Sequence, residues 1–375
     1  MQLVAYGAQD IYLTGNPQIT FFKVVYRRHT NFSMEAIEQT LQGSTAAGNT
    51  QTSTISRNGD LIHMMYLEVQ WSEANHGGGS MVTKSPGAFM LDTVDLEIGG
   101  QLIDRHTGQW METWAELTEK TRLEDTGSYG GTLFGEMAGM GEGSTSTGAD
   151  TDYFVPLQFW FCRNPGLALP LIALQYHEVK LKIKWASNDA VTNLSGQPKL
   201  YVDYIYLDTD ERRRFAQVSH EYLIEQLQYQ ELAATKINEI NFNHPVKELI
   251  WRHNASSGDS SIMNISTNNK FHIKLNGHDR FSKRPTRYFT HSQVWQYHNG
   301  GIYGESPIAV YSFALKPEEH QPSGTCNFSR IDNAQLVSDN NFENTGVGAS
   351  GGVIYAVNYN VLRIMSGMGG LAYSN

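Results

Sequence analysis

Residues 165–185 read Pro-Gly-Leu-Ala-Leu-Pro-Leu-Ile-Ala-Leu-Gln-Tyr-His-Glu-Val-Lys-Leu-Lys-Ile-Lys-Trp, and this stretch decides the fold class. Its last seven residues alternate between apolar side chains and lysines. Successive side chains of a β-strand point to opposite faces of a sheet, whereas a helix would scatter the three lysines around its circumference. The pattern therefore predicts a half-buried strand from Val179 to Trp185, after a turn at Asn164-Pro165-Gly166.

A second unit of the same kind follows later in the chain. Residues 154–161 and 165–185 read as a strand, a proline-framed loop and another strand, and residues 308–336 repeat that order. Three further pairs of short segments echo one another in the same order: 37–39 with 224–226, 96–100 with 273–277, and 201–206 with 354–359. Four ordered matches predict two copies of one all-β unit.

Length and composition are consistent with two globular units. A chain of 375 residues is too long for one compact core and long enough for two. Hydrophobic residues make up 40% of the chain and the mean hydropathy is −0.40. No run approaches the roughly 18 apolar residues that a membrane span needs. Residues 1–10 lack the features of a signal peptide, so we expect no export by the secretory route.

The charge balance and the two cysteines argue against two further classes of protein. A formal net charge of −10 disfavours a generic nucleic-acid binder, because phosphate binding depends on clustered cations. Cys162 and Cys326 are too few for a disulfide framework and suit a reducing compartment such as the cytosol. Both lie among aromatic or apolar residues, which predicts buried free thiols.

The N-terminal arm, residues 1–30, differs from the rest of the chain in charge. Lys23, Arg27 and Arg28 against the single acidic residue Asp10 give it a charge of +2. The arm is either a capped first strand or a segment that reaches a neighbour or an acidic surface, and both alternatives stay open.

Turn signals predict where several strands meet. Two strands within residues 34–71 are expected to flank a polar loop at 43–56. Asn58-Gly59-Asp60 predicts a hairpin, because Asn-Gly favours positive φ. A second hairpin is expected within residues 240–251, around Asn243-His244-Pro245.

One convincing helix is expected in the first half, from Gly108 to Arg122. Trp110, Trp114 and Leu117 are spaced by four and three residues and so share one helical face. Residues 127–150 are rich in glycine, serine and threonine without periodicity, which predicts a long exposed loop.

A basic triplet, Arg212-Arg213-Arg214, lies near the middle of the chain. Asp208, Asp210 and Glu211 precede it, so a self-neutralised linker is favoured over a nucleic-acid site. The predicted organisation is an all-β chain with an arm at 1–30, a first sandwich at 31–212, a linker at 213–220 and a second sandwich at 221–375.

The motifs of common enzymes and metal proteins are not found in the sequence. The 13 histidines form no His-Glu-x-x-His or His-x-His pattern, and neither a Gly-x-Ser-x-Gly elbow nor a P-loop occurs. His177 and Glu178 are expected on a strand, where they point to opposite faces. We therefore expect no catalytic residues, no cofactor and no metal ligands, although a metal site assembled from distant strands stays open.

Glycosylation sequons occur at Asn31, Asn193, Asn254, Asn264 and Asn327. Asn193 and Asn254 lie in polar segments and are the candidate glycan attachment sites. Asn327 begins an expected strand, so it is expected to be occluded.

Several long motifs carry a resemblance to a known family. They include Leu3-Val-Ala-Tyr-Gly-Ala-Gln-Asp-Ile-Tyr-Leu-Thr-Gly-Asn-Pro-Gln-Ile-Thr-Phe-Phe22 and Pro322-Ser-Gly-Thr-Cys-Asn-Phe-Ser-Arg-Ile-Asp-Asn-Ala334. Others are residues 55–61, 165–181, 220–228 and 358–373. The chain resembles the major capsid proteins of the nucleocytoplasmic large DNA viruses, most of all those of algal (chlorella) viruses, over nearly its whole length.

The resemblance implies two consecutive eight-stranded jelly rolls with short helices in their loops. It further implies a homotrimer of near-hexagonal outline that tiles an icosahedral virion shell made in the host cytoplasm. Implied partners are neighbouring capsomers and minor capsid proteins, with an internal viral membrane nearby that the chain does not span, and no sequence-specific nucleic acid. Lys23, Arg27 and Arg28 are the candidates for the inward side, and the serine-, threonine- and glycine-rich loops are the candidates for outward contact with the host surface.

Two alternatives remain at this stage. One is a minor capsid, vertex or spike paralogue of the same fold. The other is a carbohydrate-binding β-sandwich, since aromatic residues make up 11% of the chain. Clustering of Trp71, Trp251 and Trp295 in an open groove would favour a sugar site, and their packing inside sandwiches would remove that hypothesis.

Overall fold

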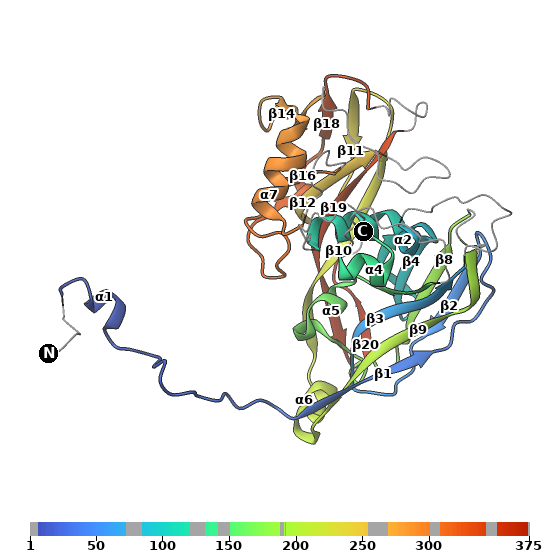
Figure 1. The fold of residues 1–375 in the computed structure, drawn as a ribbon, viewed down its shortest axis with the longest axis vertical. Coiled ribbons are helices and arrows are strands. Elements are labelled where there is room, and N and C mark those ends of the chain that lie inside the picture. The colour runs from blue at the N-terminus through green and yellow to red at the C-terminus, as the bar shows by residue number, and fades with distance from the viewer. Residues whose placement is uncertain are drawn as a thin grey trace.

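The computed structural model describes residues 7–72, 85–119, 132–141, 151–187, 191, 193–253, 269–300, 308–342 and 351–373. Its strands form two antiparallel β-sandwiches that lie next to each other in one chain (Figure 1). The first takes its strands from residues 32–207 and the second from residues 220–371.

The first sandwich packs two sheets face to face. One contains β1 (Phe32–Gln39), β9 (Leu194–Leu207), β3 (Leu61–Trp71) and β6 (Thr151–Pro156), in that spatial order, with β7 (Leu169–Pro170) paired to β3. The other contains β2 (Thr50–Thr54), β8 (Val179–Trp185), β4 (Leu91–Ile98) and β5 (Gln101–Thr107). This arrangement of eight strands is a jelly roll.

The second sandwich repeats the arrangement. One sheet contains β10 (His220–Leu232), β19 (Gly352–Met365), β12 (Pro245–His253) and β16 (Ala309–Ser312), with β17 (Cys326–Asn327) paired to β12 and β20 (Met368–Leu371) to β19. The other contains β11 (Ile237–Ile240), β18 (Ala334–Ser338), β13 (Lys270–Leu275) and β14 (His278–Asp279), with β15 (Arg284–Pro285) paired to β13. Both halves connect their eight main strands in the same order, so the fold is a double jelly roll.

The four echoing sequence pairs lie on equivalent strands, which confirms the predicted duplication. Residues 37–39 and 224–226 lie on β1 and β10, and residues 96–100 and 273–277 lie on β4 and β13 with the turns that follow them. The longer pair, 154–185 and 308–336, spans β6 to β8 and β16 to β18, and residues 201–206 and 354–359 lie on β9 and β19. In the last pair, 201–206 with 354–359, the sequence match is shifted by one residue relative to the structural equivalence of the two strands. Val202 and Tyr204 face the core of their own jelly roll, whereas the matched Tyr355 and Val357 face away from theirs.

The alternation from Val179 to Trp185 is confirmed by β8. Its four apolar side chains are buried, at 2% exposure or less, between the two sheets of the first jelly roll. The lysines lie on the outer face, where Lys182 Nζ is 2.5 Å from Glu97 Oε1 and Lys184 Nζ is 2.6 Å from Asp92 Oδ2 on the neighbouring strand β4.

Both predicted hairpins are wrong. The turn at residues 58–60 joins β2 to β3, and the turn at 243–245 joins β11 to β12, but the strands on each side belong to different sheets. His244 has a φ of 66°, as a tight turn requires. A turn signal predicts a reversal of the chain but not pairing, and in a jelly roll these connections cross from one sheet to the other. The expected polar loop at 43–56 also contains β2.

The segments around β6 and β8 differ from the expected strands at their ends. The run expected at 154–161 ends as a strand at Pro156 and continues as α5 (Trp160–Arg163). A 3-10 turn, Pro165–Leu167, follows it, where Asn164 Oδ1 accepts a hydrogen bond from Gly166 N. His177 and Glu178 precede β8 instead of lying on it.

The helices refine three further predictions. The predicted helix at 108–122 is α3 (Gly108–Thr118), and residues 120–122 lie outside the described part. Within the loop expected at 127–150, the described residues 132–141 contain α4 (Leu133–Ala138). Ala138 at its end and Met140 after it are buried, so this part is not an exposed loop. The linker expected at 213–220 overlaps α6 (Thr209–Gln217), which begins four residues earlier, and Arg212 Nε pairs with Asp60 Oδ1 of the first jelly roll at 3.0 Å.

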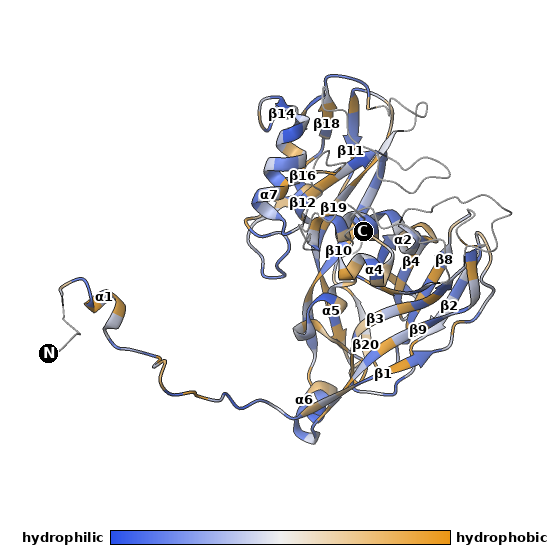
Figure 2. Ribbon diagram, viewed as in Figure 1, coloured by the Kyte–Doolittle hydropathy of each residue, from blue (hydrophilic) through white to orange (hydrophobic). Residues whose placement is uncertain are grey.

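Shorter helices complete the fold: α1 (Ile11–Thr14), α2 (Pro86–Phe89), a π-helical turn (Tyr288–Ser292), α7 (Gln293–Tyr297) and a 3-10 turn (Phe328–Arg330). The N-terminal arm carries α1 and extends away from both jelly rolls (Figure 1). Both hydrophobic and hydrophilic residues occur along its length (Figure 2). Phe22 is 99% exposed, so the arm buries little against its own chain.

The two faces of β8 make different contributions to stability. Replacing Ile183 by alanine should lower the free energy of unfolding by about 2–5 kcal/mol, because the cavity lies between two packed sheets. Replacing its neighbour Lys182 by alanine should cost less than about 1 kcal/mol, since it removes only a partly exposed ion pair. Urea unfolding of both variants measures the difference, and equal losses would contradict the assignment of the faces.

Candidate functional site at the junction of the two jelly rolls

Helix α3 belongs to the first jelly roll but covers the second. Thr107 begins it, because its side-chain oxygen accepts a hydrogen bond from Trp110 N at 3.1 Å. Trp110, Trp114 and Leu117 are buried against the outer face of the β10-β19-β12-β16 sheet. The ring centroids of Trp110 and Tyr355 are 5.0 Å apart. The helical face that the sequence predicted as apolar is therefore an interface between jelly rolls.

A buried arginine lies beside this helix. Arg252 on β12 is 1% exposed, and its Nη1 donates a hydrogen bond to Thr113 Oγ1 on α3 at 3.2 Å. Burial lowers the pKa of Arg252, against the opposing effect of Tyr355, Glu112 and Glu116. Burial raises the pKa of Glu112, which accepts hydrogen bonds from Ser85 Oγ and Gly141 N. These polar groups fix α3 in position on the second jelly roll.

A second charged cluster surrounds Glu225 on β10. Its carboxylate lies 2.8 Å from Arg163 Nη2 on α5, 2.7 Å from Lys247 Nζ on β12 and 3.4 Å from His320 Nδ1. Burial alone would raise the pKa of Glu225, but Arg163, His320 and Lys247 lower it to about 2. Lys247 is fully buried, and burial lowers its pKa despite Glu225. Arg163 comes from the first jelly roll and the other groups from the second, so the cluster joins the two.

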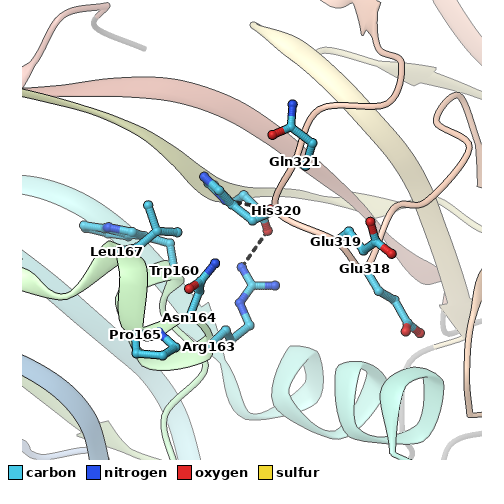
Figure 3. Close-up of a pocket in the computed structure, with 10 residues that line it drawn as sticks. Trp160, Arg163, Asn164, Pro165, Leu167, Glu318, Glu319, His320 and Gln321 are labelled. Carbon is cyan, nitrogen blue, oxygen red and sulfur yellow. Dashed lines mark ion pairs between the residues drawn. The ribbon is translucent and has the colours of Figure 1, made fainter. Parts of the chain in front are cut away.

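A cleft of about 510 Å³ opens beside this cluster. Figure 3 shows α5 and the turn after it on one wall and the β16–β18 loop with Glu318, Glu319 and His320 on the other. Arg163 from one wall and His320 from the other both pair with the Glu225 carboxylate. The carboxylates that line this cleft are all paired: Glu225 as described above, Glu318 with His298 and Glu319 with Lys316. The cleft therefore lies along a seam between the jelly rolls that ion pairs hold together.

His298 forms a third buried charge cluster next to the seam. Its Nε2 lies 2.9 Å from Glu248 Oε2 on β12, and its Nδ1 lies 3.1 Å from Glu318 Oε1 in the β16–β18 loop. Burial would lower the pKa of His298, but the two carboxylates raise it to about 9. The imidazolium therefore ties the end of α7 to a strand and a loop at neutral pH.

The C-terminal hairpin fastens the second jelly roll to the first from the other end. Tyr176 N donates a hydrogen bond to Gly367 O at 2.9 Å, and His177 Nδ1 lies 2.9 Å from Gly369 O. Gly367, in the turn of the hairpin, has a φ of 79°, a conformation that favours glycine. The glycine-rich tail is thus part of the junction.

The candidate glycan sites receive no support from the structure. Asn193 is fully buried, although a polar loop was expected, and the folded chain offers no access to its side-chain amide. Asn254 lies outside the described residues. Asn327 lies on the short strand β17 but is exposed, so the expectation that it is occluded was wrong.

The other predicted positions fall in different places. Lys23, Arg27 and Arg28 are exposed along the arm. Cys162 is buried, and burial raises its pKa to about 12, as expected for an inert thiol, whereas Cys326 is only half-buried.

The tryptophans named for the sugar-binding alternative do not share a groove. Trp71 and Trp251 are fully buried in the separate cores of the two jelly rolls. Trp295 is 82% exposed on α7. The observation that would favour a carbohydrate site is therefore missing.

Sequence reasoning missed Arg163, Lys247, Glu248 and His298. Arg163, Lys247 and Glu248 lie in segments that are otherwise mostly apolar or aromatic, which is the signal that could have flagged a buried ion pair. His298 lies between Gln296 and Asn299 and gives no such signal. Among the described residues, no group of three histidine, cysteine or acidic side chains could hold a metal ion. None of the described helices combines the length and apolar character needed to cross a membrane.

Comparisons with known proteins agree on one family. Residues 20–208 match the family described as major capsid protein N-terminus, and residues 211–370 match the large eukaryotic DNA virus major capsid protein. The chain is 53% identical to the major capsid protein of Pyramimonas orientalis virus and 44% identical to that of Paramecium bursaria Chlorella virus 1, covering 100% of this chain and 99% of each relative.

A solved structure also resembles the chain closely. PBCV-1 VP54 superimposes with a TM-score of 0.80 at 38% identity, covering 95% of this chain and 100% of that one.

The His298 cluster predicts a loss of stability in mild base. Because the folded pKa of about 9 lies above the usual 6.5, His298 stabilises the fold fully below about pH 6.5, and this contribution disappears as the pH rises through about 9. The wild-type unfolding midpoint should fall over that interval, and the His298→Gln variant should lack this part of the fall. Parallel pH profiles for the two proteins, measured by urea unfolding, would refute the assignment.

Proposed function

Because this chain belongs to the major capsid protein family of the large eukaryotic DNA viruses, and is thus a structural component of the virion capsid and not an enzyme, we propose that three copies associate into one capsomer. The capsomer has a near-hexagonal outline, since three chains contribute six jelly rolls. Such capsomers tile the icosahedral shell, which is assembled in the host cytoplasm.

The observation that carries the proposal is the identical strand order of the two jelly rolls. Two similar units in one chain allow a threefold assembly to fill a sixfold position, provided that their relative orientation is fixed. The clusters around α3, Glu225 and the C-terminal hairpin supply that fixation. The chain is therefore a rigid tile with two equivalent halves.

Contacts within and between capsomers differ in strength in this proposal. Trimerisation buries an obligate interface, on the order of 2,000–5,000 Å². Contacts between capsomers are weaker, so that a misplaced unit dissociates before the shell closes.

The N-terminal arm is the proposed contact with the interior of the particle. It exposes apolar side chains together with Lys23, Arg27 and Arg28 on a net acidic protein. An exposed apolar segment of this size requires a partner, because isolated proteins rarely leave such surface in water. Minor capsid proteins and the headgroups of the internal membrane are the proposed partners, and loops on the opposite side remain available to the host surface.

Trimerisation is tested on the purified protein. Light scattering should give about 126 kDa, three times the 42.0 kDa of one chain, over a wide range of concentrations. Particles of 42.0 kDa at every concentration would overturn the proposal.

The direction of the arm is tested with trypsin. In free capsomers the protease should cut rapidly after Lys23, Arg27 and Arg28, because the arm is exposed. In intact particles the same bonds should be protected if the arm faces inward. The N-terminal peptides are quantified by mass spectrometry, and equal cleavage rates in both samples would place the arm outside.

A further inference from the structure

The contact between α3 and the second jelly roll provides a template for a contact between chains. Helix α3 lies in the connection from the fifth strand of the first jelly roll, β5, to the sixth, β6. It buries Ile250 and Tyr355, which lie opposite each other on β12 and β19, under Trp110 and Trp114. One jelly roll thus covers the outer face of the next through the helix of this connection.

The equivalent face of the first jelly roll has no such cover in the part of the chain that the structure describes. Tyr66 on β3 lies opposite Tyr201 on β9, as Ile250 lies opposite Tyr355, and their rings stack at 5.3 Å. Phe154 on β6 adjoins Tyr66, with centroids 6.3 Å apart, and is 38% exposed. Met64, two residues before Tyr66 on the same face of β3, extends the patch at 43% exposure. An aromatic surface of this kind marks an interaction site.

The equivalent helix of the second jelly roll likewise has a bare side. The π-helical turn at Tyr288–Ser292 and α7 lie between the fifth strand, β14, and the sixth, β16. Gln293 and Val294 are buried and anchor α7 on its own jelly roll. Trp295 points outward and is 82% exposed. It is the counterpart of the tryptophans that α3 buries within the chain.

The charges of the two bare surfaces are complementary. Residues 280–298 contain Arg280, Lys283, Arg284 and Arg287 and no aspartate or glutamate, and Lys283 Nζ is paired with Asp339 Oδ1 at 2.5 Å. On the side of the sheet that carries Tyr66 and Tyr201, the strand register places these carboxylates: Glu38, Glu68, Asp152 and Asp203, with Lys199 paired to Glu68 at 3.2 Å. A basic aromatic segment therefore matches an acidic aromatic face.

We propose that α7 of one chain, led by Trp295, covers the Tyr66–Phe154–Tyr201 face of the next chain. The contact between the two copies repeats the contact that α3 makes between the two jelly rolls of one chain. The contact is heterologous, joining different surfaces of the two chains, and it closes into a ring after three copies. The inference rests on the proposed trimer and assigns its interface.

The test places a photo-cross-linker at the proposed contact. Trp295 is replaced by p-benzoylphenylalanine in the full chain, and Tyr176, an aromatic residue that is 75% exposed on the first jelly roll, is replaced in a control. On irradiation of the assembled protein, the Trp295 variant should form inter-chain products whose cross-linked peptides contain Tyr66, Phe154 or Tyr201. The control should form none with these peptides.

A second measurement uses ordinary substitutions. Trp295→Ala should raise the concentration at which half of the trimers dissociate by about tenfold or more, as expected for a buried interface tryptophan, and Trp295→Phe should restore most of the loss. Because Trp295 is exposed in the single chain, neither change should alter the unfolding of the monomer.

The outcomes separate the two proposals. A wild-type trimer whose Trp295 cross-links map elsewhere, or whose assembly is unchanged in Trp295→Ala, overturns the assigned interface and leaves the trimer intact. A wild-type chain that stays monomeric overturns both.

Discussion

The buried carboxylate of Glu225 between Arg163 and Lys247 is the interaction on which the architecture depends. Arg163 belongs to the first jelly roll, and the other two belong to the second. Removing one partner of a buried ion pair costs about 3–5 kcal/mol, because the remaining charge is left without compensation. Two sandwiches joined only by α6 would pivot about that segment. Because this carboxylate must stay paired, the two sandwiches are held in one relative orientation. A fixed orientation matters more for a capsid building block than additional stability does.

The long strands β10 and β19 explain how one chain combines two cores without a loose hinge. They pair along their full length, from His220↔Ile364 to Leu232↔Gly352. Near one end Ile224, Leu362 and Ile364 join the core of the first jelly roll, and near the other end Ile354 and Ala356 join the core of the second. Residues Gly352–Asn360 are consequently all buried, without the alternation of a half-exposed strand. The asparagines in this run are satisfied by side chains of β10, since Asn358 and Asn360 bond Gln228 and Gln226.

The sequence predicted the parts of the fold that depend on local pattern. Alternation identified β8, and repetition identified the duplicated unit, because both survive in the order of residues. It did not predict which sheet β2 or β11 joins, since a turn at Asn58-Gly59 or at His244 reverses the chain in the same way for either choice. Nor did it reveal the junction. Arg163 and Lys247 lie far apart in sequence, and only the tertiary fold brings them to one carboxylate. The expectation that Asn193 lies in an exposed polar loop was wrong for the same reason, because polar neighbours in sequence do not show whether a residue is buried.

The two jelly rolls share one strand order, but their equivalent contact surfaces differ in charge, and this difference gives direction to the proposed assembly. The helix that covers a sheet within the chain carries Glu112 and Glu116 and meets the buried Arg252. The corresponding segment of the second jelly roll is basic, and the face it would cover carries Glu68 and Asp203. If α3 covered the face with Glu68 and Asp203, and α7 covered the face with Arg252, like charges would meet in a desolvated interface. The electrostatic repulsion would then outweigh the favourable free energy of aromatic packing. A chain with identical halves could bind its neighbour through either half and form open filaments. Opposite charge on equivalent surfaces leaves one register, which is the register that the proposed threefold ring requires.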